Sequence, residues 1–184
     1  MKTSSWIVAG LWISFGVFNA LAEPETKQIW AKPLLGEKAP PLVVDKWLTA
    51  PPETKGKFVL VDFWATWCPP CRAAIAELNE IHEKLGDSVV VIGLSDESEE
   101  TIKAFQAQAK RDEPGWVIHY YVAIDPQARM KSAVEVTGIP HVLLVDPRGV
   151  VRWEGFPFLT DHELSLDVVQ GIVNRFGPAA SEPK

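Results

Sequence analysis

The sequence predicts an α/β domain built on a central mixed sheet with helices on both faces. Two apolar runs of strand length, residues 59–63 and 89–94, enclose a helical pattern at 71–85, and this order is that of a βαβ unit with parallel strands. Two later apolar runs, residues 142–145 and 150–153, flank an Asp-Pro-Arg-Gly turn, which is typical of an antiparallel hairpin. The length of 184 residues fits one such domain and an export segment.

The first residues have the pattern of an export signal. Lys2 precedes an apolar stretch from Trp6 to Phe18, and Ala20-Leu21-Ala22 has the small-x-small form of a signal-peptidase site. We predict a signal peptide at residues 1–22, cleaved after Ala22, with an uncleaved anchor as the alternative. The apolar stretch is shorter than the ~20 residues that a spanning helix needs. The protein is therefore expected outside the cytoplasm, in the periplasm or an equivalent compartment.

The remaining chain divides into a leader, a domain and a tail. We expect residues 23–35 to form a polar leader, residues 36–177 the folded domain, and residues 178–184 a mobile tail. Apolar residues at 42–44, after a proline pair, predict a short first strand. The central strand at 59–63 follows a second proline-containing loop.

Helical spacing of apolar residues predicts a helix at 71–85, which Gly86 ends. A polar helix follows the second parallel strand. It begins at Asp96 or Ser98 and continues to Lys110, with glutamates near its start and basic residues near its end.

The last third of the chain is predicted to hold a strand at 117–124 and a short helix at 126–136, before the hairpin. The final helix is expected to begin at Thr160, which forms a capping box with Glu163, and to end at Phe176 before a Gly-Pro pair.

Charge and cysteine content narrow the function. The formal net charge is −6 and no basic run occurs, so nucleic acid and anionic membrane surfaces are excluded as partners. The chain has two cysteines, both in one Cys-x-x-Cys. A disulfide across so short a loop would stabilise the fold only weakly, which favours a redox pair over a structural bridge.

The two cysteines lie where the central strand passes into a helix. Helix N-terminal amides favour a negative charge, so Cys68 is expected to ionise readily, to be exposed and to act as the nucleophile, while Cys71 is shielded and resolves the mixed disulfide. Pro69 and Pro70 have no backbone N–H, which leaves Cys71 as the chief donor to the thiolate. Modest activation of Cys68 favours a reducing role.

Three motifs together carry a family resemblance. The run Asp62-Phe63-Trp64-Ala65 before Trp67-Cys68-Pro69-Pro70-Cys71, with Gly138-Ile139-Pro140 later, resembles the thioredoxin superfamily, and specifically its exported TlpA/ResA-like branch. The resemblance covers about residues 36–176. It implies a thioredoxin fold with an N-terminal extension and an inserted helix and strand, and a redox-active disulfide between Cys68 and Cys71.

The resemblance also implies roles for other residues. Asp62 would lie buried near Cys71 and deprotonate it, the alternative being a solvated carboxylate at a sheet edge. Pro140 would be a cis proline facing the disulfide, so that the backbone of Ile139 pairs with a client strand.

Three aromatic residues close to the motifs are less sharply assigned. Trp67 would be an exposed docking surface, and Trp64 would pack under the site or serve as an ordinary core residue. His141 would tune the thiol, bind a metal beside it, or be an ordinary histidine at the edge of a strand.

These residues predict an exported dithiol–disulfide oxidoreductase that reduces disulfides of client proteins and draws electrons from a membrane donor. We expect a monomer with no cofactor and no bound metal. The alternatives are an oxidase that donates disulfides, a thiol peroxidase, and a copper-binding module that uses Cys68, Cys71 and His141. Ala74 stands where many cytochrome-maturation members of the branch carry a glutamate, so apocytochrome c is not assigned as the client.

Overall fold

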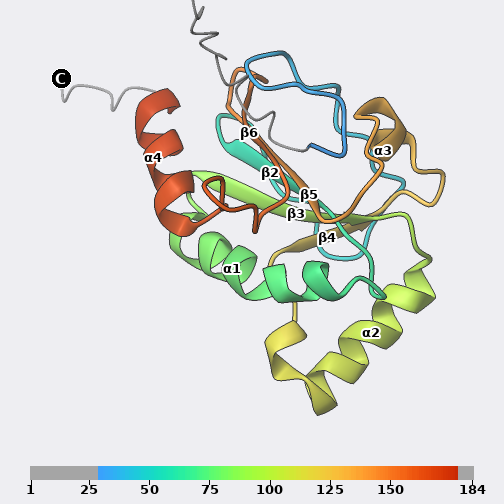
Figure 1. The fold of residues 1–184 in the computed structure, drawn as a ribbon. Coiled ribbons are helices and arrows are strands. Elements are labelled where there is room, and N and C mark those ends of the chain that lie inside the picture. The colour runs from blue at the N-terminus through green and yellow to red at the C-terminus, as the bar shows by residue number, and fades with distance from the viewer. Residues whose placement is uncertain (1–28, 178–184) are drawn as a thin grey trace, which may run out of the picture.

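The computed structural model describes residues 29–177, which form a six-stranded mixed sheet covered by helices (Figure 1). The predicted signal peptide at 1–22, residues 23–28 of the predicted leader and the predicted tail at 178–184 lie outside the described residues. No helix within the described part of the chain is both long and apolar enough to cross a membrane.

The strands follow the spatial order β1-β4-β3-β2-β5-β6. Strands β2, β3 and β4 are parallel, whereas β1, β5 and β6 each run antiparallel to their neighbours. The bounds are β1 Lys46–Trp47, β2 Phe58–Phe63, α1 Pro69–Leu85, β3 Val89–Ser95, α2 Glu99–Asp112, a 3-10 turn Pro114–Trp116, β4 Tyr121–Ile124, α3 Arg129–Ala133, β5 His141–Val145, β6 Val151–Gly155 and α4 Leu166–Phe176.

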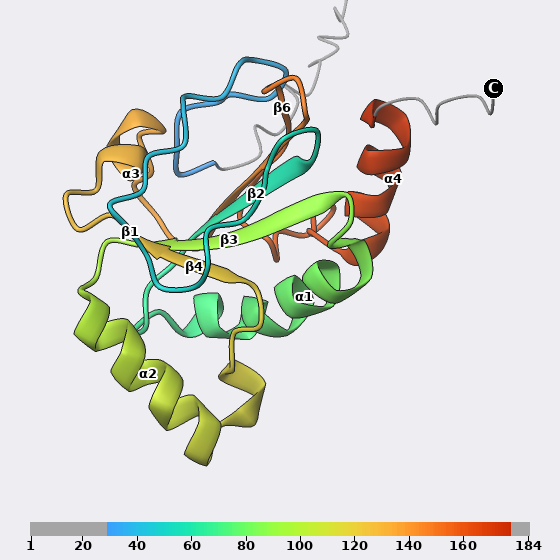
Figure 2. The same cartoon turned by 180° about the vertical axis from the view of Figure 1, so that it is seen from behind.

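Helices α1, α2 and α4 cover one face of the sheet, and α3 with the N-terminal segment covers the other (Figures 1 and 2). Alternation along β2 decides which side chains meet which layer. Leu60 and Trp64 belong to the core under α1, and Val61 and Phe63 belong to the core under α3. Asp62 is two residues from both Leu60 and Trp64, so its side chain points to the same face, and its carboxyl is on the α1 face of the sheet.

The βαβ unit and the hairpin are confirmed, but the predicted first strand at 42–44 is wrong. The chain pairs at an isolated bridge between Lys38 and Val150, and then at β1, where Lys46 lies opposite Ile124. The proline pair before residue 42 lacks amide hydrogens, so it cannot contribute donors to a ladder there.

The predicted start of the last helix at Thr160 is also wrong. Helix α4 begins at Leu166, and the side chain of Ser165 accepts the Val168 N–H at 3.3 Å as its N-cap. Tertiary contacts hold the preceding segment out of a helix: the ring of His162 stacks on Trp153 with centroids 4.8 Å apart. The predicted end at Phe176 is confirmed.

Other boundaries moved by a few residues. Helix α1 starts at Pro69 rather than residue 71, with Cys68 as N-cap, and Gly86 at its end keeps right-handed helical angles. Of the two starts proposed for α2, Ser98 is the N-cap. The strand predicted from residue 117 shortens to β4. The 3-10 turn and the Asn79 side chain, which donates to the Val117 carbonyl and accepts the His119 N–H, hold the preceding residues away from the ladder.

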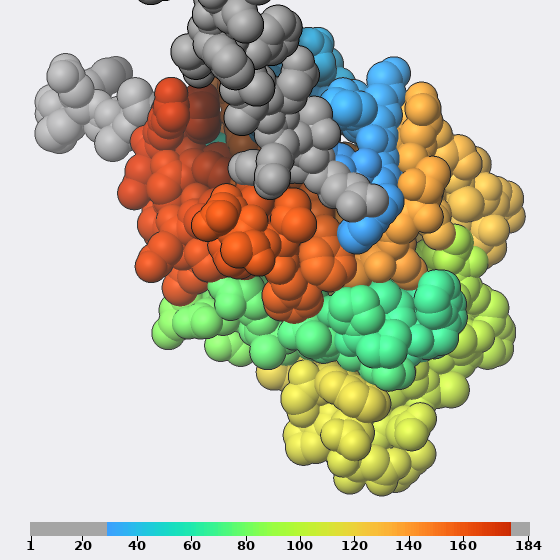
Figure 3. All heavy atoms as spheres, in the orientation of Figure 1, coloured from blue at the N-terminus to red at the C-terminus, as the bar shows by residue number. Residues whose placement is uncertain are grey.

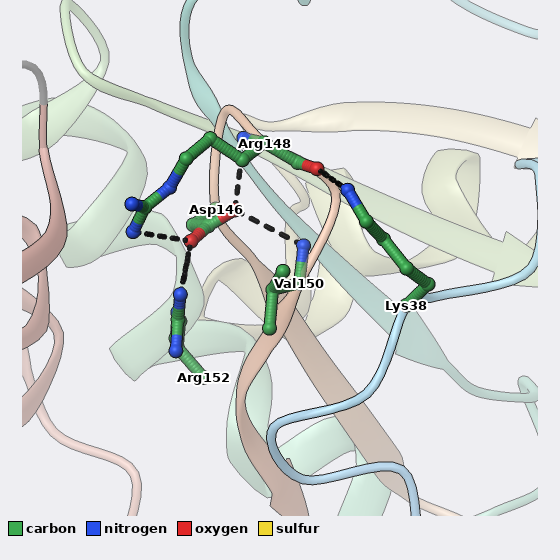
Figure 4. A network of polar contacts seen from close by, with 5 residues as sticks. All are labelled: Lys38, Asp146, Arg148, Val150 and Arg152. Atoms are coloured by element: carbon green, nitrogen blue, oxygen red, sulfur yellow. Dashed lines mark hydrogen bonds and ion pairs between the residues drawn. The ribbon is translucent and has the colours of Figure 1, made fainter.

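A buried carboxylate organises the β5–β6 turn (Figure 4). Asp146 accepts the backbone N–H groups of Arg148 and Val150 at 2.8 and 3.0 Å. Its other oxygen accepts from the guanidinium groups of Arg152 at 2.8 Å and Arg148 at 3.2 Å. The ammonium group of Lys38 bonds to the carbonyl of Arg148, which ties the turn to the N-terminal segment.

The N-terminal segment starts beside the α3–β5 loop and then runs along β6. The buried carboxylate of Glu154 accepts the N–H groups of Leu34 and Leu35 at 2.9 Å. Further along, the carbonyl of Trp30 accepts the Thr137 N–H at 2.7 Å. Figure 3 shows this segment, in blue, lying against orange segments of the second half of the chain, with α1 in green below.

Candidate active site

The two cysteines form a disulfide at the junction of the β2–α1 loop and α1. Cys68 is the N-cap, with extended backbone angles, and Pro69 and Pro70 fill the first helical positions, where a missing N–H costs nothing. The Cys71 N–H points at the Cys68 sulfur with 3.2 Å between nitrogen and sulfur. The donor predicted from the two prolines is thus the one that the structure shows.

The loop before β5 covers the disulfide. The peptide bond between Ile139 and Pro140 is cis, as predicted, and the Ile139 carbonyl oxygen lies 3.8 Å from the Cys68 sulfur. Cys68 is 2% exposed, so the predicted exposure of this cysteine is wrong for the disulfide form. Cys71 is fully buried as predicted. Trp67, the residue before Cys68, is 67% exposed.

Asp62 is fully buried on a central strand, between β3 and β5. The predicted burial is confirmed, and the alternative of a solvated carboxylate at a sheet edge is wrong. Neither carboxyl oxygen has a hydrogen-bond partner among the described residues. Burial raises the pKa of Asp62 to about 8, because no nearby group compensates the ionised form. A carboxyl with that pKa exchanges a proton close to neutral pH.

Trp64 packs under the site as predicted, with 2% of its surface exposed and its ring 5.6 Å from that of Phe105. The sequence analysis missed Tyr120, which is equally buried on the same face. Burial and the nearby charge of Asp62 both raise the pKa of Tyr120. Tyr120 directly precedes β4 and Tyr121 is the first residue of that strand, and the sequence alone does not show which of the two side chains turns inward.

The loop that carries Trp67 is held by two further residues that the sequence analysis missed. The Glu97 carboxylate accepts the N–H and hydroxyl of Thr66 at 2.6 and 2.8 Å. The guanidinium of Arg72 donates to the Thr66 carbonyl at 3.0 Å and lies over the Trp116 ring at 4.5 Å. Glu97 lies between β3 and α2 and Arg72 in the first turn of α1, both half-buried, and charged residues are common at such positions and give no signal of a role.

His141 is the first residue of β5, an interior strand of the sheet, and it does not join the cysteines. It is buried on β5, between β2 and β6, and lies opposite Phe63, whose side chain belongs to the α3 face of the sheet. Burial lowers the pKa of His141 to about 4, so the ring is neutral at physiological pH. Between residues 29 and 177, no group of three or more His, Cys, Asp or Glu side chains is placed to hold a metal ion.

The sequence matches a family model and several known proteins. The AhpC/TSA family model matches residues 36–154. A thiol-disulfide oxidoreductase ResA of Bacillus cereus is 33% identical over 101 residues, covering 54% of each chain. A thiol:disulfide interchange protein DsbE of Tatumella citrea is 31% identical over 127 residues, covering 69% of this chain and 64% of the relative. The chain thus matches between about half and two thirds of the length of these curated relatives.

A solved structure supports the same assignment. The thioredoxin domain of a thiol-disulfide oxidoreductase from Bacteroides vulgatus superposes with a TM-score of 0.57 at 26% identity, covering 78% of this chain and 98% of the other. The resemblance to ResA-like proteins of the thioredoxin superfamily is confirmed, and so is the mixed-sheet thioredoxin fold. The chain belongs to the thioredoxin-like AhpC/TSA family.

Proposed function

We propose that this protein is an extracytoplasmic thiol–disulfide oxidoreductase that reduces disulfide bonds of client proteins. The observation that carries the proposal is the Cys68–Cys71 pair at the N-terminus of α1, beside the Ile139 carbonyl and on the face of the sheet that holds buried Asp62. This arrangement supplies a nucleophilic sulfur, a second sulfur within bonding distance, and a carboxyl that takes up a proton near neutral pH.

The reaction is an exchange of two disulfides. In the reduced protein the Cys68 thiolate attacks one sulfur of the client disulfide, and the other client sulfur leaves as a thiolate. The Cys71 thiol then loses its proton to the Asp62 carboxylate and attacks the Cys68 sulfur. The client is released with both sulfurs reduced, and the protein keeps the Cys68–Cys71 disulfide. A donor of two electrons must reduce this disulfide before the next cycle.

The reducing direction rests on the weak stabilisation of the Cys68 thiolate by the backbone N–H groups at the start of α1. Pro69 and Pro70 offer no N–H, and Cys71 provides the donor at 3.2 Å. A weakly stabilised thiolate leaves the reduced form reactive and favours a low reduction potential.

The setting of the site is also part of the proposal. The signal-peptide pattern at residues 1–22 supports export, and we propose a membrane protein as the electron donor. The client enters as an extended strand that pairs with the backbone of Ile139, with exposed Trp67 providing apolar contact.

A redox titration tests the function and its direction together. The protein is equilibrated in defined thiol–disulfide buffers and followed by tryptophan fluorescence, since Trp64 and Trp67 lie close to the sulfurs in sequence. We expect a midpoint near about −270 mV, and a midpoint near about −120 mV would identify an oxidase instead. Reduction of insulin disulfides by the protein is the activity assay. The Cys71→Ser variant should accumulate a mixed disulfide with insulin, and the Cys68→Ser variant should form none.

A thiol peroxidase of the same fold is the alternative to test. Both cysteines of the chain lie in the one disulfide, and none stands apart as a separate peroxidatic thiol. Hydrogen peroxide consumption is measured against insulin reduction under the same conditions. Consumption of peroxide at a rate above that of insulin reduction would overturn the proposal.

A further inference from the structure

Gly93 brings buried polar groups of the α1 face together. It lies on β3 directly opposite Asp62 on β2. A Cβ atom at Gly93 would lie 3.0 Å from Trp64 Nε1 and 3.0 Å from Tyr120 Cε2. The indole N–H and the edge of the phenol ring therefore both approach the backbone at the residue that neighbours Asp62.

None of these polar groups is satisfied within the described part of the chain. Trp64 Nε1, the Tyr120 hydroxyl and both Asp62 oxygens are buried, and no hydrogen-bond partner lies within reach of any of them. An unsatisfied buried polar atom costs about 1–3 kcal/mol, so native proteins rarely gather four of them in one place. Where they do, the groups take part in chemistry or share a bound water.

The surroundings supply no charge to balance an ionised Asp62. Of the titratable groups on α1, Cys71 is buried toward this face, Glu77 accepts the Leu166 N–H, and His82 packs against Tyr121. No buried side chain that α2, α4 or β5 contributes to this core is titratable: these are Ile102, Phe105, Ala109, Val169, Val142 and Leu144. Help for the Asp62 carboxylate must come from neutral donors.

We propose that the Tyr120 hydroxyl and the Trp64 indole N–H bind one water molecule beside the Asp62 carboxyl, and that this water donates a hydrogen bond to the Asp62 carboxylate. The water accepts hydrogen bonds from the two donors and donates one hydrogen bond to the carboxylate, so three of its four hydrogen-bonding positions are used. Tyr120 and Trp64 are then positioning residues, which stabilise the ionised form that Asp62 needs in order to accept the Cys71 proton.

This role in catalysis rests on the proposed function, but the binding of the water does not. With the disulfide intact neither cysteine titrates, so the titration of Asp62 is measured without interference. The protein is labelled with ¹³C at aspartate carboxyls, and the Asp62 signal is followed by NMR from pH 5 to pH 10. Tyr120→Phe removes the hydroxyl and keeps the ring. Tyr121→Phe makes the same change at the adjacent half-buried tyrosine and is the matched control.

We expect Tyr120→Phe to raise the pKa of Asp62 by about one unit, since a hydrogen bond to the charged form is lost. The control should leave that pKa unchanged. Equal titration curves for the two variants, or a fall in the Tyr120→Phe variant, would overturn the proposal.

Thermal unfolding and crystallography give independent readouts. If the hydroxyl binds a water, Tyr120→Phe melts below the wild type, whereas removal of a hydroxyl without partners leaves the melting temperature equal or higher. A crystal structure should show a water within about 3.2 Å of Trp64 Nε1 and the Tyr120 oxygen. Failure of the wild type to reduce insulin, with these shifts present, would disprove the proposed function and leave this inference intact.

Discussion

Buried carboxyl groups in different parts of the fold have opposite surroundings. On the α1 face, Asp62 has no hydrogen-bond partner, and burial raises its pKa to about 8. Elsewhere the buried acids are satisfied. Asp125 accepts from Arg129 at 2.7 Å and from the Met130 N–H at 2.9 Å, and Glu154 accepts two backbone N–H groups.

Asp146 shows the contrast most clearly. Burial by itself raises its pKa, but the N–H groups of Val150 and Arg148 and the guanidinium groups of Arg152 and Arg148 outweigh burial, and the pKa is lowered. A carboxylate surrounded by donors fixes a turn, whereas one left without them keeps its proton and stays available for chemistry. The comparison separates structural acids from the acid that we propose as the proton acceptor, without reference to any relative.

The largest test of this difference is the pH dependence of stability in Asp62→Asn. The unfolded carboxyl loses its proton above its ordinary pKa of 3.8, while the folded one keeps it up to about 8. Because the unfolded state binds fewer protons in that interval, the wild type loses stability as pH rises from about 4 to about 8. The variant, which never ionises, should be more stable by on the order of 5 kcal/mol at pH 9 and equal near pH 4.

Urea unfolding of the oxidised proteins at pH 4, 6.5 and 9 measures this effect. The exposed Asp112→Asn substitution at the end of α2 is the control and should run parallel to the wild type. A wild type whose stability stays constant from pH 4 to pH 9 would show that Asp62 is ionised throughout.

Asp146→Asn tests the opposite kind of acid. The amide keeps one acceptor oxygen and loses the charge, so at least one buried donor and the pairing with Arg152 are left unsatisfied. We expect a loss of about 3 kcal/mol in the free energy of unfolding at pH 7, measured with urea. Asp161→Asn is the control, since Asp161 is exposed and its left-handed backbone, with φ of 61°, suits asparagine. Equal losses in both variants would contradict the assignment.

The smallest expected effect is at Glu154. Glu154→Gln keeps one acceptor for the two N–H groups of Leu34 and Leu35, so the change is local. Amide hydrogen exchange at these two residues should speed up about tenfold, which corresponds to about 1.4 kcal/mol. Exposed Glu163→Gln serves as control, and unchanged exchange in Glu154→Gln would mean that the segment is held by its other contacts.

The elements around the disulfide could be predicted because their sequence patterns are local. The apolar run of β2, the Cys-x-x-Cys and the helical spacing of α1 occur within one stretch of chain, and the burial of Asp62 follows from its place in that run. The hairpin of β5 and β6 was equally clear from its turn residues. These predictions needed no knowledge of distant contacts.

The errors arose where distant segments decide. Cys68 is covered by the loop at Ile139, which lies 71 residues away in sequence. The capping box predicted at Thr160 does not form, because His162 packs on Trp153 and holds this segment out of a helix. Glu154 lies out of phase with Trp153, and alternation alone would leave it in solvent. The N-terminal segment that covers it gives no periodic signal.

The two ends of the described chain lie unequally close to the disulfide. Trp30 lies over Gly138, two residues before the cis proline, since a Cβ there would lie 3.0 Å from Trp30. At the other end, a Cβ at Gly177 would lie 3.9 Å from Phe58, the first residue of β2. The disulfide comes after the opposite end of that strand, beyond Phe63. A fluorescent reporter or surface tether joined after α4 should therefore leave the disulfide accessible (Figure 1), whereas one joined just before Ile29 would lie close to the loop that covers it.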